Sequence, residues 1–302
     1  MKKIFSVFFS ISAIIVCMNL APHAYASDLA AIGTYEALTR DAMFNNSPLV
    51  QEIQEKYGEL TLVKESDLYY VTEYYEETQT QDLRMNELGY SIVKVFEEYP
   101  AEYIASLENS IDVQTIEPGR VGVKDFGVIR IQLSFSKIPN TTNYHVFSFF
   151  QWLKLPVANK VDGKIMGACG LTLSRQLVID GSSVEGRLGY TQKIGTSTTT
   201  QQIDLPISSS STDGAGGYFE LTHAKSGTME NYITALSGQV SCIAMQSNLS
   251  DMYASGLACY TDVQECASID GISVSFPAGI SLDTSVGAVE TEYNLQDALH
   301  LV

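Results

Sequence analysis

From residue 127 onward the chain is a succession of short β-favouring runs separated by turn residues, and this pattern limits the fold more than any other feature. Runs rich in valine, isoleucine, threonine and aromatic residues are divided by glycine, serine, asparagine and aspartate. Asp-Gly pairs begin at residues 162, 180, 213 and 270, and such pairs favour tight turns. The runs cover residues 128–135, 144–152, 165–173, 187–194, 201–207, 218–222, 232–245, 256–260, 272–276 and 289–293.

This spacing predicts an antiparallel sheet. A parallel sheet would need helical crossovers, and no helical stripe of that length is found in this half of the chain. We therefore predict a jelly-roll-like antiparallel β-sandwich over residues 119–295, followed by a tail of residues 296–302. The single tryptophan, Trp152, is expected to be buried in the core of the sandwich.

The region before residue 119 has a mixed texture, so the fold class as a whole is predicted to be α+β. Residues 48–57 are expected to form a short helix ended by Gly58, and residues 67–75 a strand with residues 60–63 as its candidate partner. Apolar residues spaced by three and four predict an amphipathic helix, or two in series, over residues 88–111. The region 27–118 is either a separate domain or a layer covering one sheet.

The first 26 residues have the order of a secretory signal peptide. Lys2 and Lys3 precede an apolar run, and Ala24-Tyr25-Ala26 provides a cleavage site before Ser27. Lipid attachment at Cys17 is not expected, because the residue before a lipidated cysteine is normally small and here it is Val16. The mature chain is predicted to begin at Ser27, to have no stable membrane anchor and to be secreted.

The charge of the chain restricts its partners. The formal net charge is −17, and loss of Lys2 and Lys3 with the signal peptide makes the mature chain more negative. A field of this sign repels phosphate backbones and anionic lipid headgroups. Nucleic acid and electrostatic docking on membranes are therefore excluded, and an extracellular glycan or protein is the expected partner. The oligomeric state is left open.

Four cysteines remain after removal of the signal peptide, and their even number in an oxidising compartment suggests two disulfides. Of the three connectivities we predict Cys259 with Cys266, which closes a short loop, and Cys169 with Cys242, which ties distant strands together. The alternative is a structural zinc site, but no two cysteines have zinc-knuckle spacing.

No catalytic or metal-binding motif is present. His145 lies in a strand run and His223 at a strand end, both outside any such motif, and they are expected to be hydrogen-bonded structural histidines. A pair of carboxylates facing each other across a cleft would suffice for carbohydrate hydrolysis, but the sequence does not select the pair among 35 acidic residues. The Asp-Gly turns could supply oxygen ligands to Ca²⁺, although turn chemistry alone explains them.

Residues 189–217 are rich in serine and threonine and poor in bulky apolar residues. Amphipathic hairpins of pore-forming toxins have a similar composition, and so does an exposed edge hairpin of a soluble sandwich. A membrane-spanning strand needs an alternating apolar face of about 9 to 11 residues, and this segment has none. Pore formation is therefore the lesser alternative.

The segment 144–162 places Trp152, Pro156 and Asp162 in the spacing W-x3-P-x5-D after an aromatic strand. It resembles a segment of uncharacterised secreted β-rich proteins of Gram-positive bacteria. The resemblance covers under a tenth of the chain and implies an exported bacterial sandwich, without an activity or a site.

The sequence thus predicts a secreted, non-enzymatic binding or interaction protein of unknown ligand. A secreted acid-pair hydrolase acting on carbohydrate is the alternative. No catalytic, cofactor-binding or metal-binding residue is proposed.

Overall fold

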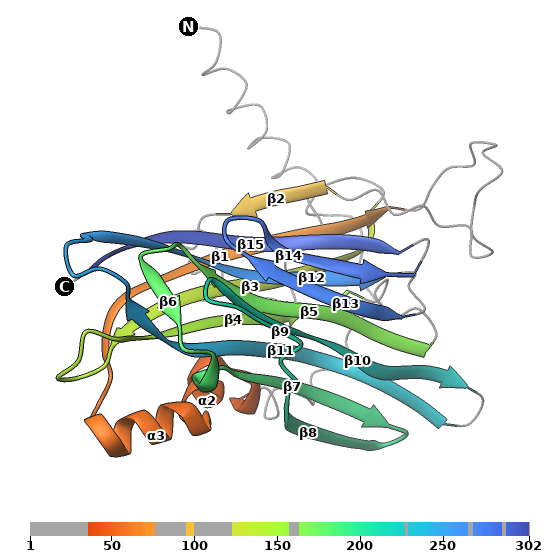
Figure 1. Ribbon diagram of the computed structural model, residues 1–302. Helices are drawn as coiled ribbons and strands as arrows, with labels where there is room; N and C mark the ends of the chain where they lie inside the picture. Colours follow the sequence, from red (N-terminus) through yellow and green to blue (C-terminus); the bar gives the residue numbers. More distant parts are fainter. Residues whose placement is uncertain are drawn as a thin grey trace, which may run out of the picture.

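The computed structural model describes residues 36–75, 95–99, 123–156, 163–226, 229–264, 268–285 and 288–301, and Figure 1 shows their arrangement. Short helical elements come first and strands follow. In chain order the elements are η2 Glu36–Leu38, α2 Arg40–Asn45, α3 Pro48–Tyr57, β1 Thr61–Tyr75, β2 Val95–Tyr99, β3 Val123–Lys137, β4 Tyr144–Lys154, β5 Gly163–Leu173, β6 Leu177–Ile179, η5 Gly181–Ser183, β7 Glu185–Ile194, β8 Ser197–Asp204, β9 Ser209–Ser210, β10 Gly214–Ser226, β11 Met229–Gln246, β12 Tyr253–Gln264, β13 Ile269–Ser275, β14 Gly279–Thr284 and β15 Val289–His300.

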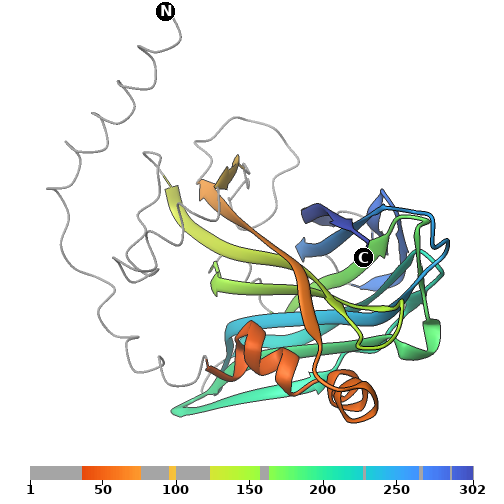
Figure 2. The same ribbon diagram turned by 90° about the vertical axis from the view of Figure 1, so that its left-hand side faces the viewer.

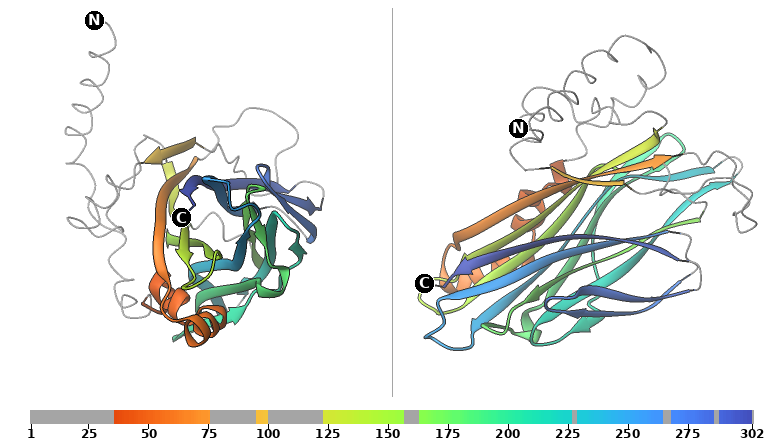
Figure 3. Two further views of the ribbon diagram at one scale, coloured as in Figure 1. Left: turned by 60° about the vertical axis from the view of Figure 1, so that its left-hand side comes forward. Right: turned by 90° about the horizontal axis from the view of Figure 1, so that it is seen from above.

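The strands form two antiparallel layers. The hydrogen-bonded order is β15-β12-β5-β10-β11-β4-β3-β1-β2, with β6 and β7 also paired to β11, β8 paired to β7 and β9 paired to β10. Strands β10 and β11 pair through only three residue pairs beside their connection. The sheet folds over at this point, so that β10, β5, β12 and β15 face β11, β4, β3 and β1. Figure 3 (left) shows the two layers curving toward one another.

The two layers are joined along the seam between β15 and β1. Ser66 and Lys64 of β1 both contact the carboxylate of Asp297, with the Lys64 Nζ at 3.2 Å. Further along, the Thr72 hydroxyl lies 2.8 Å from the Tyr293 hydroxyl. These bonds between side chains replace the backbone ladder that would otherwise close the structure.

The interior between the layers is strongly aromatic. Phe150 and Trp152 point inward from β4, and Tyr260 and Tyr293 meet them from β12 and β15. The rings of Phe150 and Tyr260 stack with centroids 4.1 Å apart, and the Trp152 indole N–H donates to the Tyr260 hydroxyl at 3.1 Å. Burial of such large rings supplies much of the apolar free energy of the core.

The N-terminal helices cover the outer face of the layer that contains β4, β7 and β11, and Figure 2 shows them on this one face. Helix α2 begins after Thr39, whose side chain accepts from the Ala42 N–H. From this helix Met43 and Phe44 pack against Phe147 of β4.

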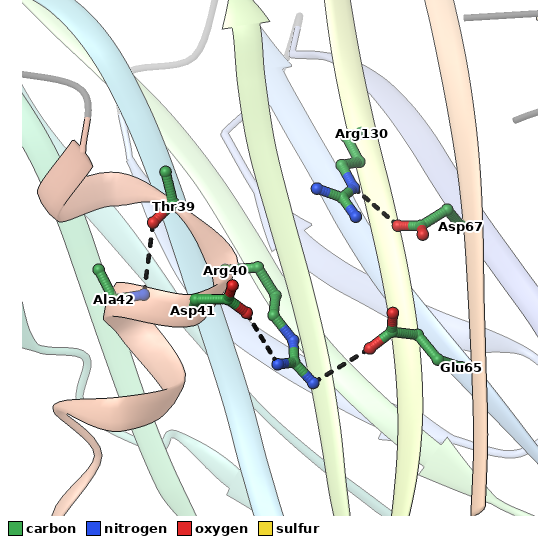
Figure 4. A network of polar contacts seen from close by, with 7 residues as sticks. All are labelled: Thr39, Arg40, Asp41, Ala42, Glu65, Asp67 and Arg130. Carbon is green, nitrogen blue, oxygen red and sulfur yellow. Dashed lines mark hydrogen bonds and ion pairs between the residues drawn. The ribbon is translucent and has the colours of Figure 1, made fainter. Parts of the chain in front are cut away.

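Ion pairs hold α2 and β1 in place. The Arg40 guanidinium bridges Asp41 at 3.0 Å and Glu65 of β1 at 3.1 Å (Figure 4). In the same figure Arg130 of β3 pairs with Asp67 of β1 at 2.7 Å. Helix α2 is therefore bound to β1, and β1 is bound to β3 by side-chain contacts as well as by backbone pairing.

A small hairpin covers part of the opposite layer. Strands β13 and β14 pair with each other and lie over β5, β10 and β12, where Val274 and Ile280 contact Leu257 and Cys259. The approach is close enough to require glycine, because a Cβ atom at Gly214 would lie 2.3 Å from the Val274 carbonyl oxygen.

The predicted antiparallel β-sandwich is confirmed, and so are the helix at residues 48–57, its end at Gly58 and the burial of Trp152. Three predictions are wrong. Residues 60–63 do not pair with residues 67–75, because β1 runs through both and pairs with β3. Residues 95–99, predicted as helix, form β2 and pair with β1. The predicted tail is strand up to His300, because β15 pairs with β12 over its whole length.

Other predictions lie outside the described residues. They are the signal peptide with its cleavage site before Ser27, the remainder of the helix predicted at residues 88–111, and the domain boundary at residue 118. The region 27–118 does contribute β1, which pairs with β3 from Thr61 to Tyr75.

We predict that His145 makes the fold sensitive to acid. Burial, together with the nearby positive charge of Arg40, lowers the pKa of His145 to about 3. In the unfolded chain the pKa returns to about 6.5. The unfolded state therefore binds the proton first, and stability falls as the pH drops from 6.5 towards 3.

Chemical denaturation of wild type and His145→Phe at pH 7 and pH 5 tests this. From pH 7 to pH 5 the free energy of unfolding of the wild type should fall by on the order of 2 kcal/mol more than that of the variant. The reason is that uptake of one proton on unfolding changes this free energy by about 1.4 kcal/mol per pH unit. The exposed His300→Gln serves as control. An equal loss in wild type and His145→Phe would contradict the assignment.

Candidate functional site

One end of the sandwich exposes a group of large apolar side chains. They belong to residues 245–253, the end of β11, the turn and the start of β12, which we call the tip loop. Met245 is 40% exposed, Leu249 75%, Met252 60% and Tyr253 63%. In Figure 1 this loop is the blue turn at the left-hand end, beside the C-terminus. A cluster of exposed apolar side chains on one loop points to an interaction site.

Internal hydrogen bonds fix the shape of the tip loop. The Gln246 side-chain amide donates to the carbonyls of Asn248 and Asp251, both at 3.1 Å. The Asp251 N–H donates to the Asn248 carbonyl, and the Ser250 N–H donates to the Asn248 side chain. The apolar side chains consequently project from a turn whose own polar groups bond to one another.

The tip loop is also tied to its neighbours. The turn between β5 and β6 accepts from Ser247 at two carbonyls, Arg175 and Gln176, both at 2.9 Å. On the other side the Leu301 N–H donates to the Met252 carbonyl at 2.9 Å. The ring of Tyr253 packs edge-on against His300 with centroids 5.1 Å apart.

A groove of about 630 Å³ lies beside the tip loop. Its lining includes Val178 of β6, which pairs across the sheet with Met245, so the groove and the tip loop are continuous. Cross-strand partners share one face of a sheet. The lining consists of Leu173, Ser174, Arg175, Gln176, Leu177, Val178, Thr212, Asp213 and Phe276.

The groove carries one charge of each sign among its described lining residues, Arg175 and Asp213. Asp213 accepts from the Ser211 hydroxyl at 2.7 Å, which fixes its carboxylate in the turn before β10. The guanidinium of Arg175 is on the exposed turn between β5 and β6. The surface can therefore meet both an anionic and a cationic group of a ligand.

The two structural histidines differ from each other. His223 accepts from the Ile233 N–H through Nδ1 at 3.0 Å, which confirms a hydrogen-bonded role. His145 is buried against Phe44 and Phe147, but neither of its ring nitrogens has a hydrogen-bond partner in the described part of the chain. The expectation of a hydrogen-bonded His145 is therefore wrong.

The most buried carboxylate among the described residues is that of Asp262 on β12, which faces the interior rather than a cleft. It accepts from the Gln264 side-chain amide at 3.0 Å and lies 3.5 Å from the Tyr260 hydroxyl. In the groove Asp213 is the one carboxylate of the described lining. Asp262 and Asp213 therefore lie in separate parts of the fold, one in the interior and one in the groove, and do not face each other across a cleft.

The aspartates of two Asp-Gly turns bond to serines of their own turns. Asp180 accepts from the N–H and the hydroxyl of Ser182, and Asp213 accepts from Ser211. Within the ranges that the structure describes, no three His, Cys, Asp or Glu side chains gather as metal ligands would. Calcium at these turns stays a prediction.

The predicted bond between Cys169 and Cys242 is wrong, because both residues are free thiols in the structure. They lie on β5 and β11, in opposite layers, and each thiol is buried in the core without a bond to the other. Cys259 is also a free thiol and faces the β13–β14 hairpin. Its predicted partner, Cys266, lies outside the described residues.

The serine- and threonine-rich segment 189–217 contains the hairpin of β7 and β8. Its turn has Gly195 at a φ of 59°, and β8 pairs with β7 from Ser197 to Asp204. Most of β8 is exposed, including its Ile203 at 39%, and Ile194 at the end of β7 is 45% exposed. The segment continues through β9 into β10.

Comparison with known proteins gives no family. No protein-family model and no curated protein sequence matches the chain. Among solved structures, the delta-toxin of Clostridium perfringens is 9% identical with a TM-score of 0.30, covering 58% of this chain and 85% of the toxin. The collagen-binding subdomain of the Enterococcus faecalis surface protein ACE is 8% identical with a TM-score of 0.24, covering 52% and 87%.

A structure described as a pore forming protein is 7% identical with a TM-score of 0.28, covering 56% of this chain and 86% of its own. Likenesses at these scores carry no argument about function. Within the described residues, no helix has both the length and the apolar character needed to cross a bilayer.

Sequence reasoning missed the tip loop. A signal was present, because Leu249, Met252 and Tyr253 stand in an otherwise polar stretch between the runs 232–245 and 256–260, and the first of these runs ends at Met245. The stretch was interpreted only as a connection between two strands, and the exposure of its apolar side chains was therefore not predicted.

We predict that the three described thiols are unreactive in the folded protein. Burial, the largest influence at each, raises the pKa of Cys169, Cys242 and Cys259 well above its usual range. Alkylation of the unreduced mature protein, followed by peptide mass spectrometry, should label none of these three in the native state and all three in denaturant. A disulfide-linked peptide containing Cys169 and Cys242 would contradict the structure.

Proposed function

We propose that this is an exported, non-enzymatic binding protein that contacts its ligand through the tip loop and the adjoining groove. The observation that supports the proposal is the exposure of Met245, Leu249, Met252 and Tyr253 on one loop that is held rigidly at the end of the sandwich. Exposed apolar side chains cost little when isolated, but a group of them gains free energy when a ligand covers it.

The scaffold suits a binding role. Long paired strands place the tip loop, the turn between β5 and β6 and the C-terminal residues at one end, so a ligand would meet a preformed surface. Preformed surfaces bind with a smaller loss of conformational entropy than mobile ones. The groove supplies polar and charged groups that can orient the ligand.

A paired set of variants tests whether the tip loop is the binding surface. The purified mature protein is screened against a glycan array, immobilised extracellular matrix proteins and lipid vesicles, and eluates are checked for cleavage products. Leu249→Ser/Met252→Ser removes the two most projecting aliphatic side chains of the tip loop. Ile194→Ser/Ile203→Ser makes the same kind of change on the β7–β8 hairpin, away from the tip loop.

We expect the screen to give a ligand, and we expect the tip-loop variant to bind it at least about tenfold more weakly than wild type. The reason is that each buried apolar side chain contributes about 1.5–3 kcal/mol to the binding free energy. The hairpin variant should bind within about twofold of wild type, since it leaves the apolar contact area unchanged. Equal loss in both variants, or retention by the tip-loop variant, would contradict the proposed surface. Chemical conversion of the ligand would instead indicate an enzyme.

A further inference from the structure

We propose that the partner of the tip loop is the surface of a lipid bilayer with zwitterionic headgroups of the phosphatidylcholine type. This inference rests on the proposed function and specifies its partner. It follows from the shape of the tip loop, its internal hydrogen bonds, its aromatic rim and the charges around it.

The shape of the tip loop favours a fluid partner. Leu249 and Met252 are 75% and 60% exposed, and the turn that carries them lies at one end of the sandwich (Figure 1). A protein partner would need a matching concave pocket for this projection, whereas the boundary between headgroups and acyl chains adapts to it. Side chains that enter this boundary gain free energy in proportion to the apolar area that they bury there.

The hydrogen bonds within the tip loop suit an environment poor in water. Backbone polar groups that approach the hydrocarbon of a bilayer lose contact with water, and hydrogen bonds within the protein lower the cost of that loss. Here the Asp251 N–H donates to Asn248, the Ser247 N–H donates to Gln176, and the Met252 carbonyl accepts from Leu301. The Gln246 amide donates to the same Asn248 carbonyl and to one further carbonyl, that of Asp251.

Two residues limit the depth of insertion. Tyr253 lies beside the projecting side chains, and its ring packs against His300, so its hydroxyl can stay in the headgroup layer while the ring faces the acyl chains. Asp251 is the one charged residue in the sequence from 245 to 253. A carboxylate is costly in hydrocarbon, so the loop would stop at the interface.

The charge distribution selects the headgroup. The tip loop has no lysine or arginine, and the whole chain has a net charge of −17, so anionic lipids repel it. The groove beside Met245 presents Arg175 and Asp213, one charge of each sign. The phosphate of such a headgroup accepts hydrogen bonds from a guanidinium, and its quaternary ammonium, which has no N–H to donate, is attracted to a carboxylate by charge alone.

Flotation with phosphatidylcholine vesicles tests the proposal on the purified mature protein. Wild type should partition onto the vesicles, Leu249→Ser/Met252→Ser should reduce the partition constant at least about tenfold, and Ile194→Ser/Ile203→Ser should change it less than about twofold. Replacing part of the lipid with phosphatidylserine should weaken binding, and added salt should reverse that weakening.

A second variant keeps the test valid if serine destabilises the loop. Trp152 is the only tryptophan and is buried. Leu249→Trp therefore adds a single exposed reporter whose emission should shift to the blue with phosphatidylcholine vesicles, and its partition should be equal to or stronger than that of wild type.

Several outcomes would overturn the lipid proposal. They are no partition of wild type on phosphatidylcholine, equal partition of the two serine variants, stronger binding to phosphatidylserine, or no emission shift of Leu249→Trp. If the tip loop instead mediates binding to a glycan or a protein while vesicles are ignored, the lipid partner is wrong and the proposed binding surface stands.

Discussion

The contact of Trp152 with Tyr260 is the interaction on which the rest of the structure depends. It crosses from β4 in one layer to β12 in the other, with a hydrogen bond of 3.1 Å that satisfies both polar atoms in an apolar interior. Phe150 stacks on the same tyrosine, and Tyr293 completes the group from β15. Loss of this contact would leave a polar atom unpaired and a large cavity between the layers.

The aromatic side chains between the layers set the distance between them. The long strands extend from this core to the end of the molecule and fix the positions of the loops there. Strand β12 pairs with β5 and β15 and begins at Tyr253, so the exposed tip loop is a direct extension of core strands. The same strands position the turn between β5 and β6, which lines the groove. The packed core therefore holds the tip loop and the groove, the surface proposed to bind the ligand, in a fixed position.

The fold could be predicted from the sequence where one local pattern decides. Short β-favouring runs divided by turn residues, with Asp-Gly pairs among them, were sufficient for the sandwich, and Pro48 and Gly58 mark the helix ends. The strand at residues 95–99 could not be predicted, because its apolar spacing also fits a helix and pairing with β1 decides between them. Cysteine pairing and the tip loop depend on which side chains meet in space, and a local pattern does not contain that information.

Oxidative footprinting is the most direct test of the claim that the tip loop is the binding surface. Met245, Met252 and Tyr253 are exposed and chemically reactive, whereas Met43 and Met166 are buried. Hydroxyl-radical labelling of the mature protein, with and without phosphatidylcholine vesicles or another captured ligand, reports each side chain separately. We expect the ligand to protect Met252 and Tyr253 and to leave the labelling of the β7–β8 hairpin unchanged. Unchanged labelling of the tip loop, with protection elsewhere, would contradict it.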